Sequence, residues 1–171
     1  MVRQLSFLSS KKEYGGTVSV GKRKERRPVV TKRPMHLVLK SSKAVGVTSL
    51  HGRSRFIEAL YKRLAKKHLI KVFEFSNNGN HLHFVIQAKT REGFKRFVTA
   101  FSGCVAQRMT QSWKGKPSEG KFWDCIPFTR ILEWGRDLRN TLDYVVQNYL
   151  EERRMISYQV RGRKKRVGLA I

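Results

Sequence analysis

The stretch from Ser76 to Gln87 limits the fold more than any other part of the chain. It reads Ser-Asn-Asn-Gly-Asn-His-Leu-His-Phe-Val-Ile-Gln. The first half favours a tight turn, because glycine and asparagine tolerate positive φ angles, and the β-rich second half predicts a strand. Alternate residues of a strand share a face, so His81 and His83 lie on one face and Leu82 and Phe84 on the other. We therefore predict a strand with one apolar face and one face that carries two imidazoles.

Two imidazoles on one face of a strand can bind a divalent metal, because neutral imidazole is a common ligand and both rings converge on one point. Two ligands alone do not hold a metal well. The alternative is that His81 and His83 are ordinary polar residues on a half-exposed strand. A metal site therefore requires a further ligand from elsewhere in the chain.

The net charge of the chain points to a polyanionic partner. Thirty-seven Lys and Arg against twelve Asp and Glu give a net charge of +25, which is typical of proteins that bind nucleic acid. A basic ribosomal or chromatin-type structural protein would share this charge. Cys104 and Cys125 stand far apart, and no apolar run approaches the length of a membrane span. We expect a cytoplasmic, DNA-associated protein without a membrane partner.

Both ends of the chain are strongly basic. Residues 1–34 have no sustained hydrophobic period, so we interpret them as a flexible arm that orders on phosphate, with a solvated tail as the alternative. Residues 153–171 form a basic tail that has no acidic residue. The candidate DNA-binding residues in these two segments are Lys22, Arg23, Lys24, Arg26, Arg27, Arg161, Arg163, Lys164, Lys165 and Arg166.

The middle of the chain, residues 35–152, alternates strand and helix patterns. The predicted elements are a strand at 35–40, a helix at 53–67, a hairpin of strands 69–75 and 82–88, a helix capped by Thr90, and an irregular or edge strand within 122–132. This order predicts an α+β, ferredoxin-like (RRM-like) split βαβ sheet of about four strands. His36, near the start of the first strand, is given a structural role by default, with contact to nucleic acid or the active site as the alternative.

A further helix is predicted at 137–152. Its apolar stripe consists of Leu138, Leu142, Val145, Val146 and Tyr149. At roughly 3.6 residues per turn, Tyr144 and Asn148 lie about 40° apart beside that stripe, whereas Gln147 projects elsewhere. Tyr144 and Asn148 can therefore act as a nucleophile and a third metal ligand, or be a half-buried aromatic and an exposed amide.

Both motifs resemble those of a known family. Asn80-His81-Leu82-His83-Phe84-Val85-Ile86 is similar to the His-hydrophobe-His (HUH) motif of single-tyrosine transposases, including the REP-associated tyrosine transposases. Thr141-Leu142-Asp143-Tyr144-Val145-Val146-Gln147-Asn148 resembles their catalytic helix. The likeness extends to 33–39 and 120–124, and it covers about residues 33–151.

The resemblance implies a metal-dependent single-stranded DNA endonuclease and strand transferase. Tyr144 would be the nucleophile that forms a 5′-phosphotyrosyl intermediate, and His81, His83 and Asn148 would hold Mg²⁺ or Mn²⁺. The implied substrate is hairpin-containing single-stranded DNA, bound by a monomer or a homodimer. REP-associated members often follow the ligand asparagine with proline, whereas this chain has Tyr149, which we predict to belong to the core.

Other functions are also compatible with the pattern. A non-catalytic RNA-binding module would use the same sheet topology, although the chain lacks the aromatic RNP-type strand of such modules. A domesticated transposase would bind hairpin DNA without cleaving it. A zinc hydrolase would combine the two histidines with Cys104 or Cys125.

Overall fold

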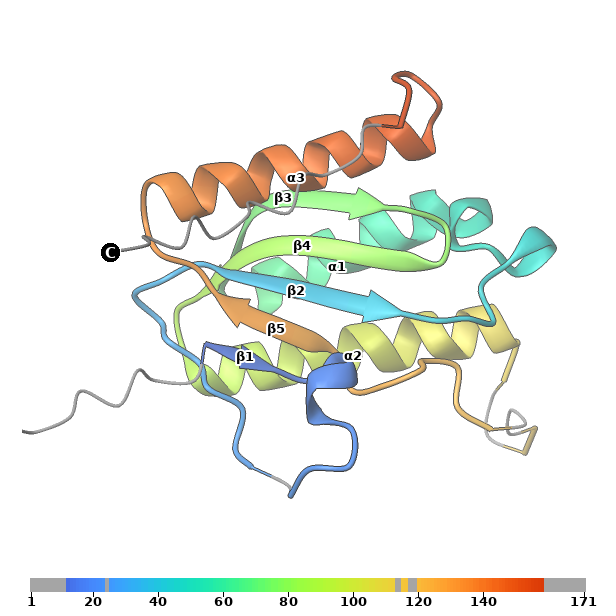
Figure 1. Ribbon diagram of the computed structural model, residues 1–171. Coiled ribbons are helices and arrows are strands. Elements are labelled where there is room, and N and C mark those ends of the chain that lie inside the picture. Colours follow the sequence, from blue (N-terminus) through green and yellow to red (C-terminus); the bar gives the residue numbers. More distant parts are fainter. Residues whose placement is uncertain (1–11, 24, 113–114, 117–119, 159–171) are drawn as a thin grey trace, which may run out of the picture.

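A single antiparallel sheet organises the molecule. The computed structural model describes residues 12–23, 25–112, 115–116 and 120–158. Within these residues, five strands lie in the order β1-β5-β2-β4-β3 (Figure 1). The strands are β1 (Glu13–Tyr14), β2 (Met35–Lys40), β3 (Ile70–Asn77), β4 (His81–Ala88) and β5 (Phe128–Ile131). Apart from the short β1, their order and crossovers are those of a ferredoxin-like sheet, so the predicted α+β fold is confirmed.

Helices α1 (Ser54–Lys67) and α2 (Arg91–Thr110) cover one face of the sheet (Figure 1). Each helix has an apolar stripe at steps of three and four residues, as the sequence predicts. Thr90 caps α2, because its side-chain oxygen accepts a hydrogen bond from the backbone N–H of Gly93. The stripes meet the apolar face of β4, where Phe84 packs against Phe97 and Phe101. This layer is the main hydrophobic core.

The turn between β3 and β4 is held by its own asparagines. Gly79 has a φ angle of 75°, and its N–H donates to Oδ1 of Asn77 at 3.1 Å. The side-chain nitrogen Nδ2 of Asn77 donates to the carbonyl oxygen of Leu50 at 3.0 Å. The turn is therefore tied to the 3-10 helix η3 (Leu50–Arg53) that precedes α1. This arrangement fixes the start of β4, where the two histidines lie.

Helix α3 (Arg136–Glu152) lies on the opposite face of the sheet (Figure 1). Val145 forms a second, smaller core there with Val85 of β4 and Leu132. The predicted apolar stripe is partly wrong, since Val146 is 41% and Tyr149 is 37% exposed. Asn148 is buried, and Tyr149 does not belong to the core.

The described part of the N-terminal segment contacts the sheet through β1 and Arg27. Glu13 and Tyr14 of β1 pair with Arg130 and Thr129 of β5. The guanidinium carbon of Arg27 lies 4.7 Å from the centre of the Tyr14 ring, and Arg27 donates to Oγ1 of Thr129 at 2.8 Å. Strand pairing and this stacked cation order a segment that has no helical or strand period of its own. Across the described residues, no helix has the length and apolarity needed to cross a membrane.

Candidate functional site

The register of β2 and β4 assembles the site on the α3 face of the sheet. Val38 is paired with His83, and Lys40 with His81. His36 is paired with Val85 of β4 and with Arg130 of β5. Because paired residues share a face, the two predicted histidines lie on the same face as His36, Lys40 and Arg130.

Three imidazoles meet on this face. The rings of His81 and His83 have centroids 4.7 Å apart. His36 Nε2 lies 3.0 Å from His83 Nδ1, within hydrogen-bond distance. His83 is only 3% exposed, whereas His81 is half-buried at the edge of the site. The buried imidazoles are thus held by the sheet, and His81 faces the more accessible side.

Helix α3 brings Tyr144 to the histidines. The Tyr144 ring lies edge-on to His83 and His36, with centroid distances of 5.7 Å and 6.1 Å. Tyr144, His36, His81 and His83 line one cleft of about 530 Å³. Asn148, one turn after Tyr144, is buried on the same helix. Tyr144 and the histidines, predicted from separate motifs, therefore lie together.

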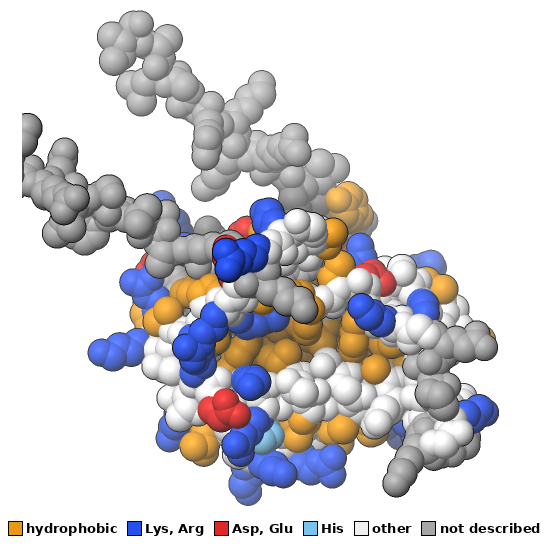
Figure 2. All heavy atoms as spheres, turned by 90° about the horizontal axis from the view of Figure 1, so that it is seen from below, with side chains coloured by type: hydrophobic (Ala, Val, Ile, Leu, Met, Phe, Trp, Pro, Cys, Tyr) orange, Lys and Arg blue, Asp and Glu red, His pale blue; other side chains and the backbone are white. Residues whose placement is uncertain are grey.

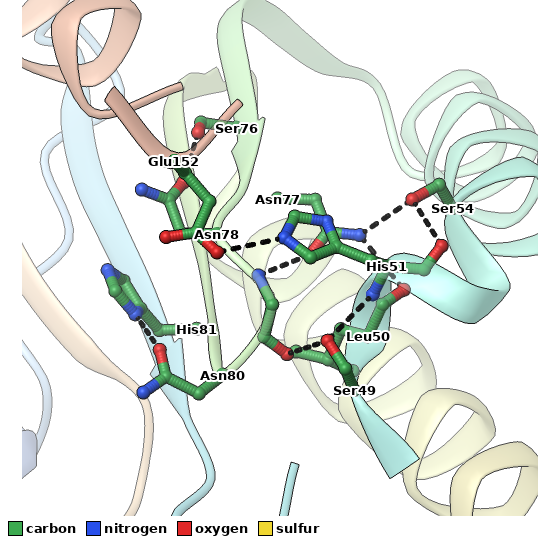
Figure 3. Close-up of polar contacts among 11 residues, drawn as sticks. Ser49, Leu50, His51, Ser54, Ser76, Asn77, Asn78, Asn80, His81 and Glu152 are labelled. Carbon is green, nitrogen blue, oxygen red and sulfur yellow. Dashed lines mark hydrogen bonds and ion pairs between the residues drawn. The ribbon is translucent and has the colours of Figure 1, made fainter. Parts of the chain in front are cut away.

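The contacts of the histidines extend to the turn before β4. Nδ1 of His81 is hydrogen-bonded to Oδ1 of Asn80 (Figure 3). Asn80 lines the same cleft, as do Lys40 and Asp124. The oxygen Oδ1 of Asp124 accepts from the backbone N–H of Ser42 at 2.7 Å. The cleft thus combines imidazole, amide, phenol, ammonium and carboxylate groups.

Burial and a neighbouring cation act on His36. Burial, together with the positive charge of Arg130, lowers the pKa of His36 from its ordinary 6.5 to about 4. Arg130 donates to Asp137 Oδ1 and to Thr141 Oγ1, each at 2.9 Å. His36 is therefore a neutral imidazole at neutral pH.

Two of the three predicted metal ligands lie together. His81 and His83 place their imidazoles on one face of β4 and line the cleft, whereas Asn148 is buried on α3 and is not among the residues that line it. Mixed nitrogen and oxygen ligands are suited to first-row divalent metals. Among the described residues, no three His, Cys, Asp or Glu side chains come together as a metal site. Cys125 lines the cleft, but a zinc site built from two histidines and a cysteine is not formed there.

The predicted DNA-binding residues have different surroundings. Lys22, Arg23 and Arg26 are exposed, whereas Arg27 is half-buried and its guanidinium lies over the rings of Tyr14 and Phe94. Lys24, Arg161, Arg163, Lys164, Lys165 and Arg166 lie outside the described residues. Figure 2 shows Lys and Arg side chains around a band of hydrophobic side chains on the face seen from below.

Sequence reasoning gave too little weight to His36 and did not identify Lys40 or Arg130. The strand pattern of residues 35–40 gave no sign of which neighbour His36 would meet. The register partners Lys40–His81 and His36–Arg130 follow from strand pairing. The spacing of His36 and Lys40, four residues apart on one predicted strand, was the one available signal, because such residues share a face.

Comparisons with known proteins give one family. The family model described as "Transposase IS200 like" matches residues 29–153. A structure of a REP-associated tyrosine transposase bound to a REP hairpin is similar, with a TM-score of 0.50 and 11% identity, over 75% of this chain and 73% of that chain. A candidate transposase from Deinococcus radiodurans R1 has a TM-score of 0.44 and 17% identity, over 74% of this chain and 98% of that chain. No curated protein sequence matches the chain. The first of these structures shares the fold described above.

Proposed function

Because the chain belongs to the IS200-like transposase family, we propose that it cleaves and rejoins single-stranded DNA with Tyr144 as the nucleophile. Membership of the family supports a transposase function. The observation that carries the finer proposal is the position of the Tyr144 ring, edge-on to both His83 and His36 in one cleft. A phenol in contact with an imidazole cluster has the groups that phosphoryl transfer to tyrosine requires.

The residues that would hold the metal are His81, His83 and Asn148. A bound Mg²⁺ or Mn²⁺ supplies Lewis acidity, which neutralises charge on the scissile phosphate. A mixed nitrogen and oxygen donor set favours Mn²⁺ over Mg²⁺. Lys40 lines the cleft, and its ammonium adds positive charge near the phosphate.

The chemical step belongs to Tyr144. Its phenolic oxygen attacks phosphorus and loses its proton as the new bond forms. The bond from phosphorus to the 3′ oxygen breaks, which gives a 5′-phosphotyrosyl link and a free 3′-hydroxyl. Attack by another 3′-hydroxyl reverses the step and joins two strands. The phosphotyrosyl link retains the energy of the phosphodiester, so no nucleotide triphosphate is required.

The proposed substrate is single-stranded DNA that contains a hairpin. One structure with the same fold is a REP-associated tyrosine transposase bound to a REP hairpin, and the net charge of +25 suits a DNA partner. The second candidate function is hairpin binding without cleavage. This second function would be favoured if the protein binds hairpin DNA but Tyr144 forms no covalent adduct with it.

A covalent-adduct assay tests the reaction. End-labelled single-stranded hairpin DNAs are incubated with the protein and Mn²⁺, and the products are separated on denaturing gels. Wild type is expected to form an adduct that Tyr144→Phe does not form. Tyr149→Phe is the matched control, because Tyr149 lies on the same helix but is exposed and is expected to keep the adduct. An adduct that survives in Tyr144→Phe and is lost in Tyr149→Phe would overturn the assignment.

A further inference from the structure

Two hydrogen bonds beside the paired histidines bear on which ring nitrogen carries the proton. Nδ1 of His81 is bonded to Oδ1 of Asn80 (Figure 3). An amide oxygen only accepts, so Nδ1 of His81 must be the donor. This places the proton of neutral His81 on Nδ1 and leaves the lone pair on Nε2.

His83 is engaged through the same atom. Its Nδ1 lies 3.0 Å from His36 Nε2, and both residues are buried on neighbouring strands. One of the two nitrogens donates and the other accepts. If His36 donates, the proton of neutral His83 is on Nε2, and that nitrogen cannot bind a metal. If His36 accepts, the proton is on Nδ1 and Nε2 carries a lone pair.

We propose that Asn80 and His36 are positioning residues that hold His81 and His83 in the same Nδ1-protonated tautomer. Both Nε2 atoms then present lone pairs to a divalent metal. Metal binding at these two histidines rests on the proposed function, whereas their tautomers are a property of the metal-free protein. A hydrogen bond to the second ring nitrogen is a common way to fix the orientation and basicity of a histidine ligand.

Nitrogen-15 NMR of the metal-free protein tests the tautomers directly. Ring ¹⁵N shifts of His81 and His83 are expected to report a protonated Nδ1 and an unprotonated Nε2 at neutral pH. His36→Leu and Asn80→Ala, which remove the acceptors, are expected to shift His83 and His81 respectively toward a tautomer mixture. A protonated Nε2 on His83 in wild type would overturn the role of His36.

Metal affinity gives the second readout. Titration calorimetry with Mn²⁺ is expected to show a loss of about 10- to 100-fold in His36→Leu and in Asn80→Ala. His36→Gln and Asn80→Asp keep an acceptor oxygen and are expected to stay within about threefold of wild type. Equal losses in the variants with and without an acceptor would contradict positioning. Wild type with the expected tautomers but no Mn²⁺ binding would refute the metal assignment and leave the tautomers intact.

An independent observation concerns a second cleft next to the site. It has a volume of about 870 Å³ and lies between the start of α1, the end of α2 and the end of α3. His51 in its wall lies beside Gly79, since a Cβ added to Gly79 would be 3.0 Å from the His51 ring. Asn80, the next residue, lines the catalytic cleft. The Asn77–Asn80 turn therefore lies between His51, which lines the second cleft, and His81, which lines the catalytic cleft (Figure 3).

This second cleft carries an excess of positive charge. Its arginines are Arg53, Arg55, Arg108, Arg153 and Arg154. Its two glutamates have partners. Oε1 of Glu152 lies 3.1 Å from Nε2 of His51, and Oε2 of Glu58 lies 3.6 Å from Nζ of Lys62. Within the described part of the chain, none of these arginines forms an ion pair with a carboxylate. Five exposed guanidinium groups repel one another unless an anion lies among them.

The geometry points to a binding site for the phosphates of the single strand that flanks the scissile phosphate, an assignment that rests on the proposed function. In the proposed reaction the scissile phosphate belongs to an unpaired strand. Neighbouring nucleotides that pass the Asn77–Asn80 turn would reach the arginines. Guanidinium groups bind phosphate oxygens through paired N–H donors.

Binding measured without catalysis tests this site. The Tyr144→Phe protein in EDTA is titrated with hairpin DNAs that carry or lack the single-stranded flank. Adding Arg53→Ala, Arg108→Ala and Arg153→Ala is expected to weaken binding to the flanked DNA at least about tenfold. Each phosphate contact with a single strand contributes about 0.7 to the slope of log K against log salt concentration. Loss of three contacts is therefore expected to lower that slope by about 2.

The control removes the same charge elsewhere. Lys66→Ala, Lys67→Ala and Lys89→Ala replace exposed lysines outside this cleft and are expected to change affinity less than about threefold. DNA without the flank is expected to bind wild-type and triple-arginine proteins equally. A loss that persists on DNA without the flank would assign the arginines to the hairpin stem and overturn the flank site. These outcomes do not depend on adduct formation, so they are separate from the test of Tyr144.

Discussion

His36 Nε2 lies 3.0 Å from His83 Nδ1, and this contact joins β2 to β4 inside the candidate site. Burial and the charge of Arg130 lower the pKa of His36 to about 4. A neutral His36 can accept a hydrogen bond from its neighbour, whereas a protonated one cannot. Protonation of His36 would therefore affect both the stability of the folded protein and the hydrogen bond between His36 and His83.

Stability is expected to depend on pH through His36. The unfolded chain takes up a proton near the ordinary pKa of 6.5, and the folded ring only near 4. The unfolded state binds more protons in this window, so stability is full above pH 6.5 and falls as the pH drops to 4. The loss is up to about 3 kcal/mol, at about 1.4 kcal/mol per pKa unit.

Urea unfolding of metal-free wild type and His36→Gln at pH 7 and pH 4.5 measures this effect. The variant is expected to lose less stability between the two pH values than wild type. An identical pH dependence in both proteins would show that other groups carry it.

The turn after β1 is expected to require glycine at position 15. Gly15 has a φ angle of 83°, and an added Cβ would lie 2.2 Å from the carbonyl oxygen of Pro127. Gly21 has a φ angle of 70°, but an added Cβ there meets no atom within 4 Å. Gly15→Ala should therefore cost about 2 kcal/mol more than Gly21→Ala, which bears only the conformational strain of about 1 kcal/mol. Chemical denaturation compares the free energies of unfolding of the two variants. Equal losses would show that β1 can move enough to make room for the added Cβ.

Arg27 is expected to hold the N-terminal segment on the sheet. Its guanidinium stacks on Tyr14 and donates to Thr129, so Arg27→Ala removes a cation–π contact and a partly buried hydrogen bond. We expect a loss of about 2 kcal/mol in the free energy of unfolding. Arg26→Ala removes a neighbouring exposed charge and should change stability by less than about 0.5 kcal/mol. Similar losses in both variants, measured by urea unfolding, would argue against a specific contact.

Asp137 is expected to stabilise the start of the helix that carries Tyr144. Burial opposes its ionisation, but hydrogen bonds from the Glu133 N–H and from Arg130 outweigh burial and lower the pKa of Asp137. This contribution is present above its ordinary pKa of 3.8 and is lost as the pH falls through the folded value. Asp137→Asn is expected to cost about 1–2 kcal/mol at pH 7.

The control for Asp137 lies on the same helix. Asp143 is exposed, so Asp143→Asn should change the thermal midpoint far less than Asp137→Asn. A midpoint that falls equally in both variants would indicate a general charge effect on α3.

Local patterns predicted the elements that build the sheet. The Asn-Gly turn, the alternation in β4 and the Thr90 cap each depend on residues within a few positions of one another. Such signals survive folding because the backbone conformations they favour are the ones that tertiary packing uses. Which residues of α3 would be buried was not predictable in this way. Tyr149 fits an apolar stripe, yet it is exposed and lines an open groove beside Val72 and Phe73 of β3.

The sequence by itself determined the order of elements and the pairing of His81 with His83 on one face, because a strand repeats every two residues. It also determined that Tyr144 and Asn148 lie on one side of a helix. Only the tertiary structure decided that His36 would meet His83 and that Tyr144 would lie against both. These contacts join β2, β4 and α3 across long stretches of chain, and their distances depend on strand register and helix rotation. Both are fixed by packing of the whole sheet, which no local pattern contains.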